Sequence, residues 1–205
     1  MERTKHSQGK TILQRLRSFK GAKGGVAATE FALIMPIMLA MYLGTVEVTQ
    51  GVLAKRRVNM LARTLADLTS QGSDGTAFTT LQPIFDAAAA VISPLSTTPL
   101  KMRITSVTIK TDGTTCVDWS DQRNWTSLAV KSSPTMPTGL ADSGATSAQQ
   151  IIMAEVQYLY TPVMAYVITG PISISDTPSY MRPRGTSKVT MDPSSGVTSA
   201  SPACS

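Results

Sequence analysis

Apolar residues form one long uninterrupted run near the start of the chain. No formal charge appears from Phe31 to Val46, and the run is filled with Ala, Leu, Ile, Met and Val. These residues span roughly 24 Å as a helix, and extending the helix to residues 26–48 supplies the roughly 30 Å of a bilayer's hydrocarbon core. The pattern predicts a transmembrane helix over residues 26–48.

Beyond Glu47 the apolar residues change to a spacing of three and four, which is the period of one helical face. The members of this stripe are Gly51, Ala54, Val58, Leu61, Leu65 and Leu68. The spacing predicts that the helix continues over residues 49–70. Its apolar stripe can pack on the rest of the same chain or on a neighbouring helix, and the sequence leaves both open.

Residues 71–205 carry mixed helix and strand signals. An alanine-rich helix is predicted over residues 78–91, ended by Ser93-Pro94. Strands are predicted over residues 100–110, 152–160, 172–175 and 179–181, because these segments are rich in Thr, Val, Ile and Tyr or alternate in polarity. Loops are predicted over residues 132–149 and 192–205. The chain is therefore predicted to have an α+β fold, in which a long N-terminal helix continues into a domain with a small antiparallel sheet.

The positive charge of the chain is confined to its start. Residues 1–25 hold seven Lys or Arg and only Glu2, whereas residues 26–205 hold twelve charges of each sign. The basic residues are not interleaved with aromatic side chains, as a surface for single-stranded nucleic acid requires. A basic leader before an apolar helix indicates a membrane protein, and nucleic acid is not an expected partner.

Three other interpretations of the apolar run compete with a processed anchor. A cleaved secretory signal also has a basic start and an apolar core, but this leader is long and no small-x-small site follows Leu43. An uncleaved anchor fits the hydropathy equally well. A buried soluble helix fits worst, given the length of the run and the basic residues before it.

The junction between leader and helix carries an unusual carboxylate. Gly24 and Gly25 end the leader, and Glu30 follows just inside the apolar run. A charge in a membrane segment costs roughly 2.5–3.5 kcal/mol on insertion scales, so it normally has a partner or a function. The alternative is that the Glu30 side chain simply reaches the membrane–water interface and has no specific partner.

These residues resemble the start of TadE-like pseudopilins of the tight-adherence (Tad/Flp) type IV pilus system. That family has a Gly-x-x-Ala-x-Glu-Phe-Ala-Leu-x-x-Pro pattern at the start of a single apolar helix. The matching residues are Gly25, Ala28, Glu30, Phe31, Ala32, Leu33 and Pro36. The resemblance is close over residues 24–47 and looser at residues 158–162 and 180–184.

The resemblance implies a bacterial inner-membrane precursor that a prepilin peptidase cuts between Gly25 and Val26. Glu30 of one subunit, next to Phe31, is then expected to pair with the new α-amine of a neighbour, and Pro36 predicts a helix kink. The implied partners are other minor pseudopilins, the major pilin, the inner-membrane assembly platform and membrane lipid. The leader is expected in the cytoplasm and residues 71–205 in the periplasm.

Cys116 and Cys204 are the only cysteines. Export to an oxidising compartment permits a disulfide between them, but spacing in sequence does not show whether their geometry allows one. Two free thiols are the alternative.

The sequence argues against an enzyme. His6 is the only histidine and lies in the leader, so the remainder has no His-dependent nucleophile or His-ligated metal. No catalytic, metal or cofactor site is expected. Trp119 and Trp125 flank a charged segment that suits either a recognition loop or core packing with a local salt bridge. An uncleaved single-pass envelope protein with an extracytoplasmic binding domain is the alternative function.

Overall fold

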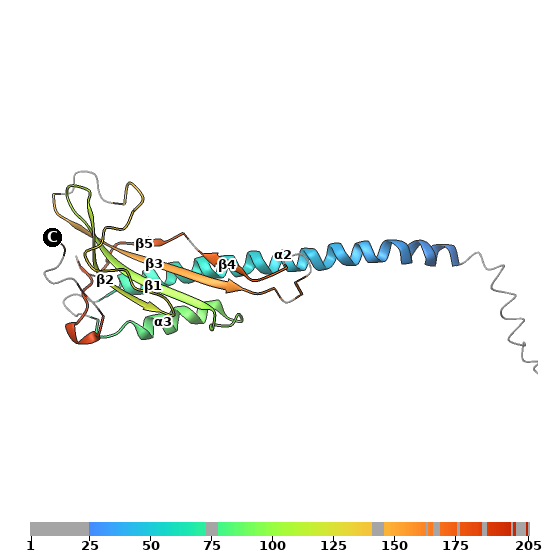
Figure 1. The fold of residues 1–205 in the computed structure, drawn as a ribbon, viewed down its shortest axis with the longest axis horizontal. Coiled ribbons are helices and arrows are strands. Elements are labelled where there is room, and N and C mark those ends of the chain that lie inside the picture. Colours follow the sequence, from blue (N-terminus) through green and yellow to red (C-terminus); the bar gives the residue numbers. More distant parts are fainter. Residues whose placement is uncertain are drawn as a thin grey trace, which may run out of the picture. The chain divides into compact units, whose positions relative to one another are not determined.

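The computed structural model describes residues 25–72, 78–140, 146–162, 164–165, 169–175, 177–185, 188–197, 199 and 204 (Figure 1). Residues 1–24 of the predicted basic leader, including Gly24, lie outside these residues. The chain divides after Val46 into two units, of which the second begins at Glu47.

One helix, α2 (Val26–Ser70), carries both the apolar run and the stripe that follows it. The predicted long helix is therefore confirmed, and Pro36 lies inside it. The helix ends where Gln71 and Gly72 donate backbone hydrogen bonds to Asp67 and Thr69. A Cβ at position 72 would lie 2.8 Å from the ring of Phe78, so a larger residue there would require this ring to shift.

The sheet of the second unit is antiparallel throughout. Its strands are β1 (Leu100–Ile109), β2 (Thr115–Arg123), β3 (Gln149–Tyr160), β4 (Ile172–Ser175) and β5 (Ser179–Met181). The order is β2-β1-β3-β4, and β5 also pairs with β3. The predicted α+β fold with a small antiparallel sheet is confirmed.

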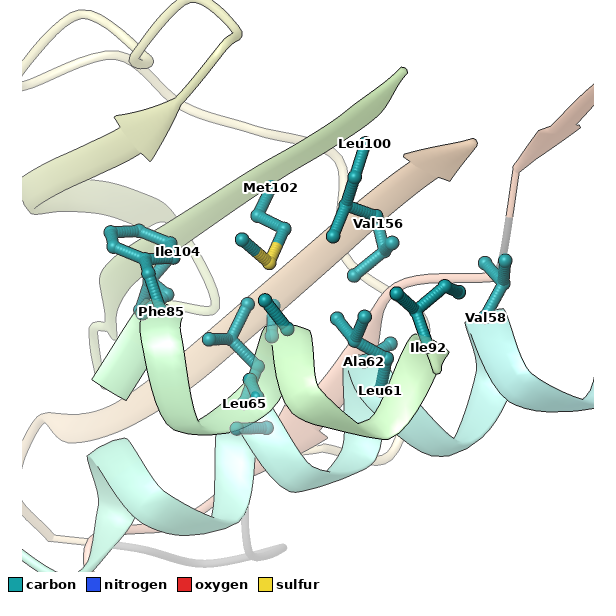
Figure 2. Packing of buried hydrophobic residues seen from close by; sticks show 14 of the residues in the cluster. Val58, Leu61, Ala62, Leu65, Phe85, Ile92, Leu100, Met102, Ile104 and Val156 are labelled. Atoms are coloured by element: carbon teal, nitrogen blue, oxygen red, sulfur yellow. The ribbon is translucent and has the colours of Figure 1, made fainter. Parts of the chain in front are cut away.

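The hydrophobic core lies between this sheet and the helices of the second unit. The buried stripe of α2 packs with a short helix, α3 (Gln82–Ala89), and the 3₁₀ turn η2 (Ala90–Ile92) that extends it. Figure 2 shows side chains from α2, α3, η2, β1 and β3 meeting in one cluster. Its labelled members are Val58, Leu61, Ala62, Leu65, Phe85, Ile92, Leu100, Met102, Ile104 and Val156. The stripe of α2 thus packs on its own chain.

Two details differ from the sequence prediction. The second helix begins at Gln82 rather than Phe78, because Phe78 forms a β-bridge with Met191 and Pro83 occupies the first turn of α3. Strand β2 was not predicted, and it contains Trp119. This tryptophan is 2% exposed, and its Nε1 donates a hydrogen bond to the carbonyl of Val189 at 2.9 Å. A recognition loop at Trp119 is therefore wrong, and core packing is confirmed.

A second short 3₁₀ turn, η3 (Pro193–Ser195), interrupts the predicted C-terminal loop. Asp192 caps it by accepting a hydrogen bond from the backbone N–H of Ser194 at 2.7 Å. The backbone N–H of Asp192 also donates a hydrogen bond to the carbonyl of Phe78. The late part of the chain is therefore fastened to the domain through residues 189–192.

Candidate functional site at the start of the apolar helix

Gly25 directly precedes α2, and the fold does not require a glycine there. A Cβ built on Gly25 meets no atom within 4 Å, and the residue is exposed. Gly185 is different, since a Cβ there would lie 2.6 Å from the carbonyl oxygen of Gly72. Within the described residues, no packing contact explains the small size of Gly25.

Glu30 and Phe31 lie on the first two turns of α2. Both are exposed, and Phe31 has 63% of its surface accessible. Glu30 follows Val26 by four residues, so the two share a helical face, and helical side chains tilt toward the N-terminus. Within the described residues the Glu30 carboxylate forms no hydrogen bond or ion pair. The carboxylate is accessible at the start of the helix.

The first unit presents apolar side chains on all sides of the helix. Its exposed large residues are Val26, Phe31, Leu33, Ile34, Met35, Ile37, Met38, Leu39, Met41 and Tyr42. Such a surface is unfavourable in water, and it marks contact with lipid or protein. The helix is long and apolar enough to cross a membrane. Residues 26–46 alone extend about 31 Å, close to the thickness of a hydrocarbon core.

Pro36 lies in the middle of this apolar surface, and α2 continues on both sides of it. Proline lacks the N–H that would bond to the carbonyl four residues earlier. The predicted kink at this position stays a prediction.

Cys116 and Cys204 are joined by a disulfide, with their Cα atoms 5.9 Å apart. Cys116 lies in β2, and Cys204 is 5% exposed. A β-bridge between Trp119 and Ser199 attaches the same C-terminal segment to β2. The last described residues are thus held to the edge of the sheet by both a covalent bond and a backbone pairing.

The structure also contains a buried polar network that the sequence analysis missed. Asp118 of β2 accepts hydrogen bonds from Ser106 at 3.2 Å and Thr108 at 2.7 Å. Gln150 of β3 donates to Ser106 at 2.6 Å and to the carbonyl of Val189 at 3.1 Å. These partners are close only because three strands meet, so periodicity could not reveal them. Because the network satisfies buried polar atoms across the sheet, it is structural in character.

The family model of TadE-like proteins matches residues 25–67. No curated protein and no solved structure matches the chain. The matched segment includes Gly25, Val26, Glu30 and Pro36 and ends near the C-terminus of α2.

The match confirms the resemblance to TadE-like proteins over this segment, and it indicates a part in the tight-adherence pilus system. The looser similarity at residues 158–162 and 180–184 lies outside the match. The candidate site and the recognised segment therefore coincide at the start of α2.

Proposed function

We propose that this chain is a minor pseudopilin that takes part in assembling or priming a Tad/Flp pilus. The observation that carries the proposal is the coincidence, within the TadE-like segment, of a glycine without a packing role and an exposed carboxylate on an apolar helix. The protein acts in this scheme as a structural component and a peptidase substrate, and not as an enzyme.

The first step is cleavage between Gly25 and Val26 by a prepilin peptidase. A protease binds its substrate in an extended form, and glycine places little steric restriction on the approach of backbone to an active site. Gly25 is exposed immediately before the first turn of α2. Fraying of that turn exposes the bond, and the small residue before it fits a narrow cleft.

The second step is pairing of the new N-terminus. Cleavage creates an α-amine on Val26 with an ordinary pKa of about 7.7–8.0, so much of it is cationic at neutral pH. The Glu30 carboxylate of a neighbouring subunit neutralises this cation within lipid, where an isolated charge is costly. The pairing sets the axial register of adjacent helices, while the exposed apolar residues supply their contact surface.

The remaining parts follow from this arrangement. The anchor lies in the bacterial inner membrane, with the leader in the cytoplasm and the sheet domain in the periplasm. Its partners are the peptidase, other minor pseudopilins, the major pilin, the assembly platform and lipid. The disulfide between Cys116 and Cys204 fits an oxidising compartment, since such bonds persist there.

The deciding experiment is intact mass and N-terminal sequencing of the membrane-extracted full chain, produced with and without a prepilin peptidase. We expect a peptidase-dependent start at Val26 that the Gly25→Leu variant abolishes. Gly170→Leu is the matched control, because a Cβ at Gly170 also meets nothing within 4 Å, yet this residue lies in the second unit.

The alternative is an uncleaved single-pass envelope protein with an extracytoplasmic binding domain. A Met1 start that persists while the same peptidase cleaves a reference prepilin would establish that alternative. Cleavage of Gly25→Leu at the same rate as the unmodified chain would also contradict the role assigned to Gly25.

A further inference from the structure

The second unit contains an apolar groove of about 530 Å³ that plays no part in the proposed processing step. It lies between the middle of α2, the segment after η2, and the end of β3. Its lining includes Gln50, Leu53, Arg57, Leu95, Leu159 and Tyr160. Leu53 and Leu159 keep 47% and 46% of their surfaces exposed, so the groove presents apolar side chains to a ligand.

Arg57 is the one residue of this lining with a formal charge at neutral pH. It is half-buried, and its Nη1 donates a hydrogen bond to the carbonyl of Ile92 at 3.3 Å. A guanidinium has five N–H donors, so this contact leaves others for an anion. Between Glu47 and Asp67, α2 carries four cationic residues and no carboxylate. The groove is therefore apolar along its length and positive at one wall.

Two tyrosines add hydrogen-bonding capacity to the lining. Tyr160 is 4% exposed, and its buried hydroxyl has no hydrogen-bond partner among the described residues. Buried polar groups are normally paired, and the described residues supply no partner for this hydroxyl. Burial raises the pKa of Tyr158, with Tyr160 contributing in the same direction, so this phenol remains protonated at neutral pH.

The position of the groove along α2 narrows the choice of ligand. Gln50 and Leu53 follow Val46 by four and seven residues in the same helix. A helix that crosses a bilayer through residues 26–46 carries its next two turns at the level of the lipid headgroups. The first cationic residues, Lys55, Arg56 and Arg57, lie one turn further along the helix, and basic residues that close to a membrane segment attract anionic lipids.

We propose that this groove binds one anionic phospholipid, with an acyl chain along Leu53, Leu95 and Leu159 and the phosphate on Arg57. The Tyr160 hydroxyl donates to an ester or phosphate oxygen of the lipid once its side chain rotates toward the ligand. An amphiphile with one negative headgroup matches the combination of an apolar trough and a single cation. The inference requires only that residues 26–46 lie in a membrane, and it does not depend on pilus assembly.

The test uses the full chain in vesicles of phosphatidylglycerol or phosphatidylcholine that contain a trace of phosphatidylglycerol with a photoactivatable acyl chain. After illumination, mass spectrometry locates the lipid adducts. We expect adducts at Leu95 and Leu159 in addition to those on residues 26–46, with competition by phosphatidylglycerol and little competition by phosphatidylcholine. Adducts confined to residues 26–46 would overturn the proposal.

Two matched pairs of variants separate the groove from general surface charge. Leu53→Gln and Arg57→Gln are expected to lower the adducts at Leu95 by at least ~threefold, because they remove an apolar wall and the phosphate contact. Val52→Gln and Arg56→Gln are the controls: Val52 is 48% exposed, and neither residue lines the groove. If test and control variants lost the adducts at Leu95 equally, Arg57 would act only as one of several basic residues that anchor the helix at the membrane surface. That result would contradict a lipid site in the groove.

A second measurement keeps the proposal falsifiable if a variant folds poorly. A photoreactive amino acid is placed at Ser96, an exposed lining residue, and the cross-linked products formed in cells are weighed. A mass increase equal to one phospholipid supports the proposal. A product the size of another protein would show that the groove binds a protein segment instead.

Discussion

The disulfide between Cys116 and Cys204 joins residues 88 positions apart and holds the end of the chain against β2. The same strand receives the bridge from Ser199 and carries Trp119, whose ring nitrogen bonds to Val189. Strand β2 lies at the edge of the sheet, paired with β1 on its other side. The C-terminal segment therefore protects an edge that would otherwise be open to pairing with another chain.

Removal of this disulfide is expected to destabilise the second unit. A loop of this length lowers the entropy of the unfolded chain by an amount worth up to about 4–5 kcal/mol in the chain-entropy model. We expect the double variant Cys116→Ser, Cys204→Ser to lower the free energy of unfolding by a large part of this value. Urea unfolding followed by tryptophan fluorescence measures it, and an unchanged midpoint would show that the bond adds nothing.

The two parts of α2 are expected to respond differently to the same substitution. Leu61 is fully buried in the core, so Leu61→Ala should cost about 2–5 kcal/mol of stability. Leu33 is 78% exposed, so Leu33→Ala should leave the unfolding of the sheet domain unchanged. Unfolding of the full chain in detergent, followed by the fluorescence of Trp119 and Trp125, compares them. Equal effects would contradict the burial of α2 from residue 54 onward.

The parts of the fold that could be predicted are those whose signal is local. In strand β3, buried positions alternate with more exposed ones from Ala154 to Tyr160, and its prediction required no distant partner. The apolar run of α2 and the motif from Gly25 to Pro36 are likewise linear patterns. They could be recognised because length, hydropathy and residue order carry the information.

The parts that were missed depend on partners far apart in sequence. Strand β2 contains Asp118 and Ser120, which look like loop residues until Thr108 and Thr105 of β1 supply their hydrogen bonds. The groove brings together residues from α2, the segment after η2 and β3, and none of them is distinctive alone. A buried polar pair or a shared cavity exists only after the strands have paired.

Arg103 is expected to contribute to stability through the ion pair that it forms within the sheet. Its Nη2 and Nε each lie 2.7 Å from Oε2 of Glu155, and its Cζ lies 4.6 Å from the centre of the Trp125 ring. Arg103→Met should cost about 1.5–3 kcal/mol, because it leaves a largely buried carboxylate without its charged partner. Arg103→Lys should restore only part of the lost stability, since the single ammonium of lysine cannot reproduce the hydrogen bonds that the planar guanidinium makes through two nitrogens.

Lys101→Met is the control for this pair. Lys101 is exposed on the same strand, so its replacement should change stability by no more than about 0.5 kcal/mol. Chemical denaturation of the three variants gives the comparison. If Lys101→Met destabilised the domain as much as Arg103→Met, strand propensity and not the ion pair would explain the result.

Asp112 is expected to titrate below its ordinary pKa of 3.8. The hydroxyl of Thr114 and then its backbone N–H, at 2.6 and 2.8 Å, donate to the carboxylate and lower its pKa. Because the folded pKa is the lower one, the stabilisation is present above the unfolded value and is lost as the pH falls through the folded value. Carboxyl NMR titration should show that Thr114→Val moves the pKa of Asp112 back toward 3.8. The control Ser194→Ala should change the pKa of Asp192 and leave that of Asp112 unchanged.

The last prediction separates processing from assembly at Glu30. Glu30→Gln should be cleaved normally, because the side chain lies five residues beyond the scissile bond. It should enter the pilus fraction poorly, since an unpaired charge in lipid costs about 2.5–3.5 kcal/mol. That cost corresponds to a loss of more than ~tenfold in incorporation. The measurement is the amount of chain starting at Val26 in sheared pili or in complexes with other pilins.

Two further variants decide whether the charge itself is responsible. Glu30→Asp keeps the carboxylate and should restore much of the incorporation. Thr29→Val removes only the hydrogen bond from its hydroxyl to the carbonyl of Val26, and it should leave incorporation unchanged. Because Gln keeps the length of Glu, equal defects of Glu30→Gln and Glu30→Asp would show that both the charge and the length of the side chain are required. If both were incorporated like the unmodified chain, Glu30 would simply reach the interface, and the register of the helices would have to come from their apolar surfaces.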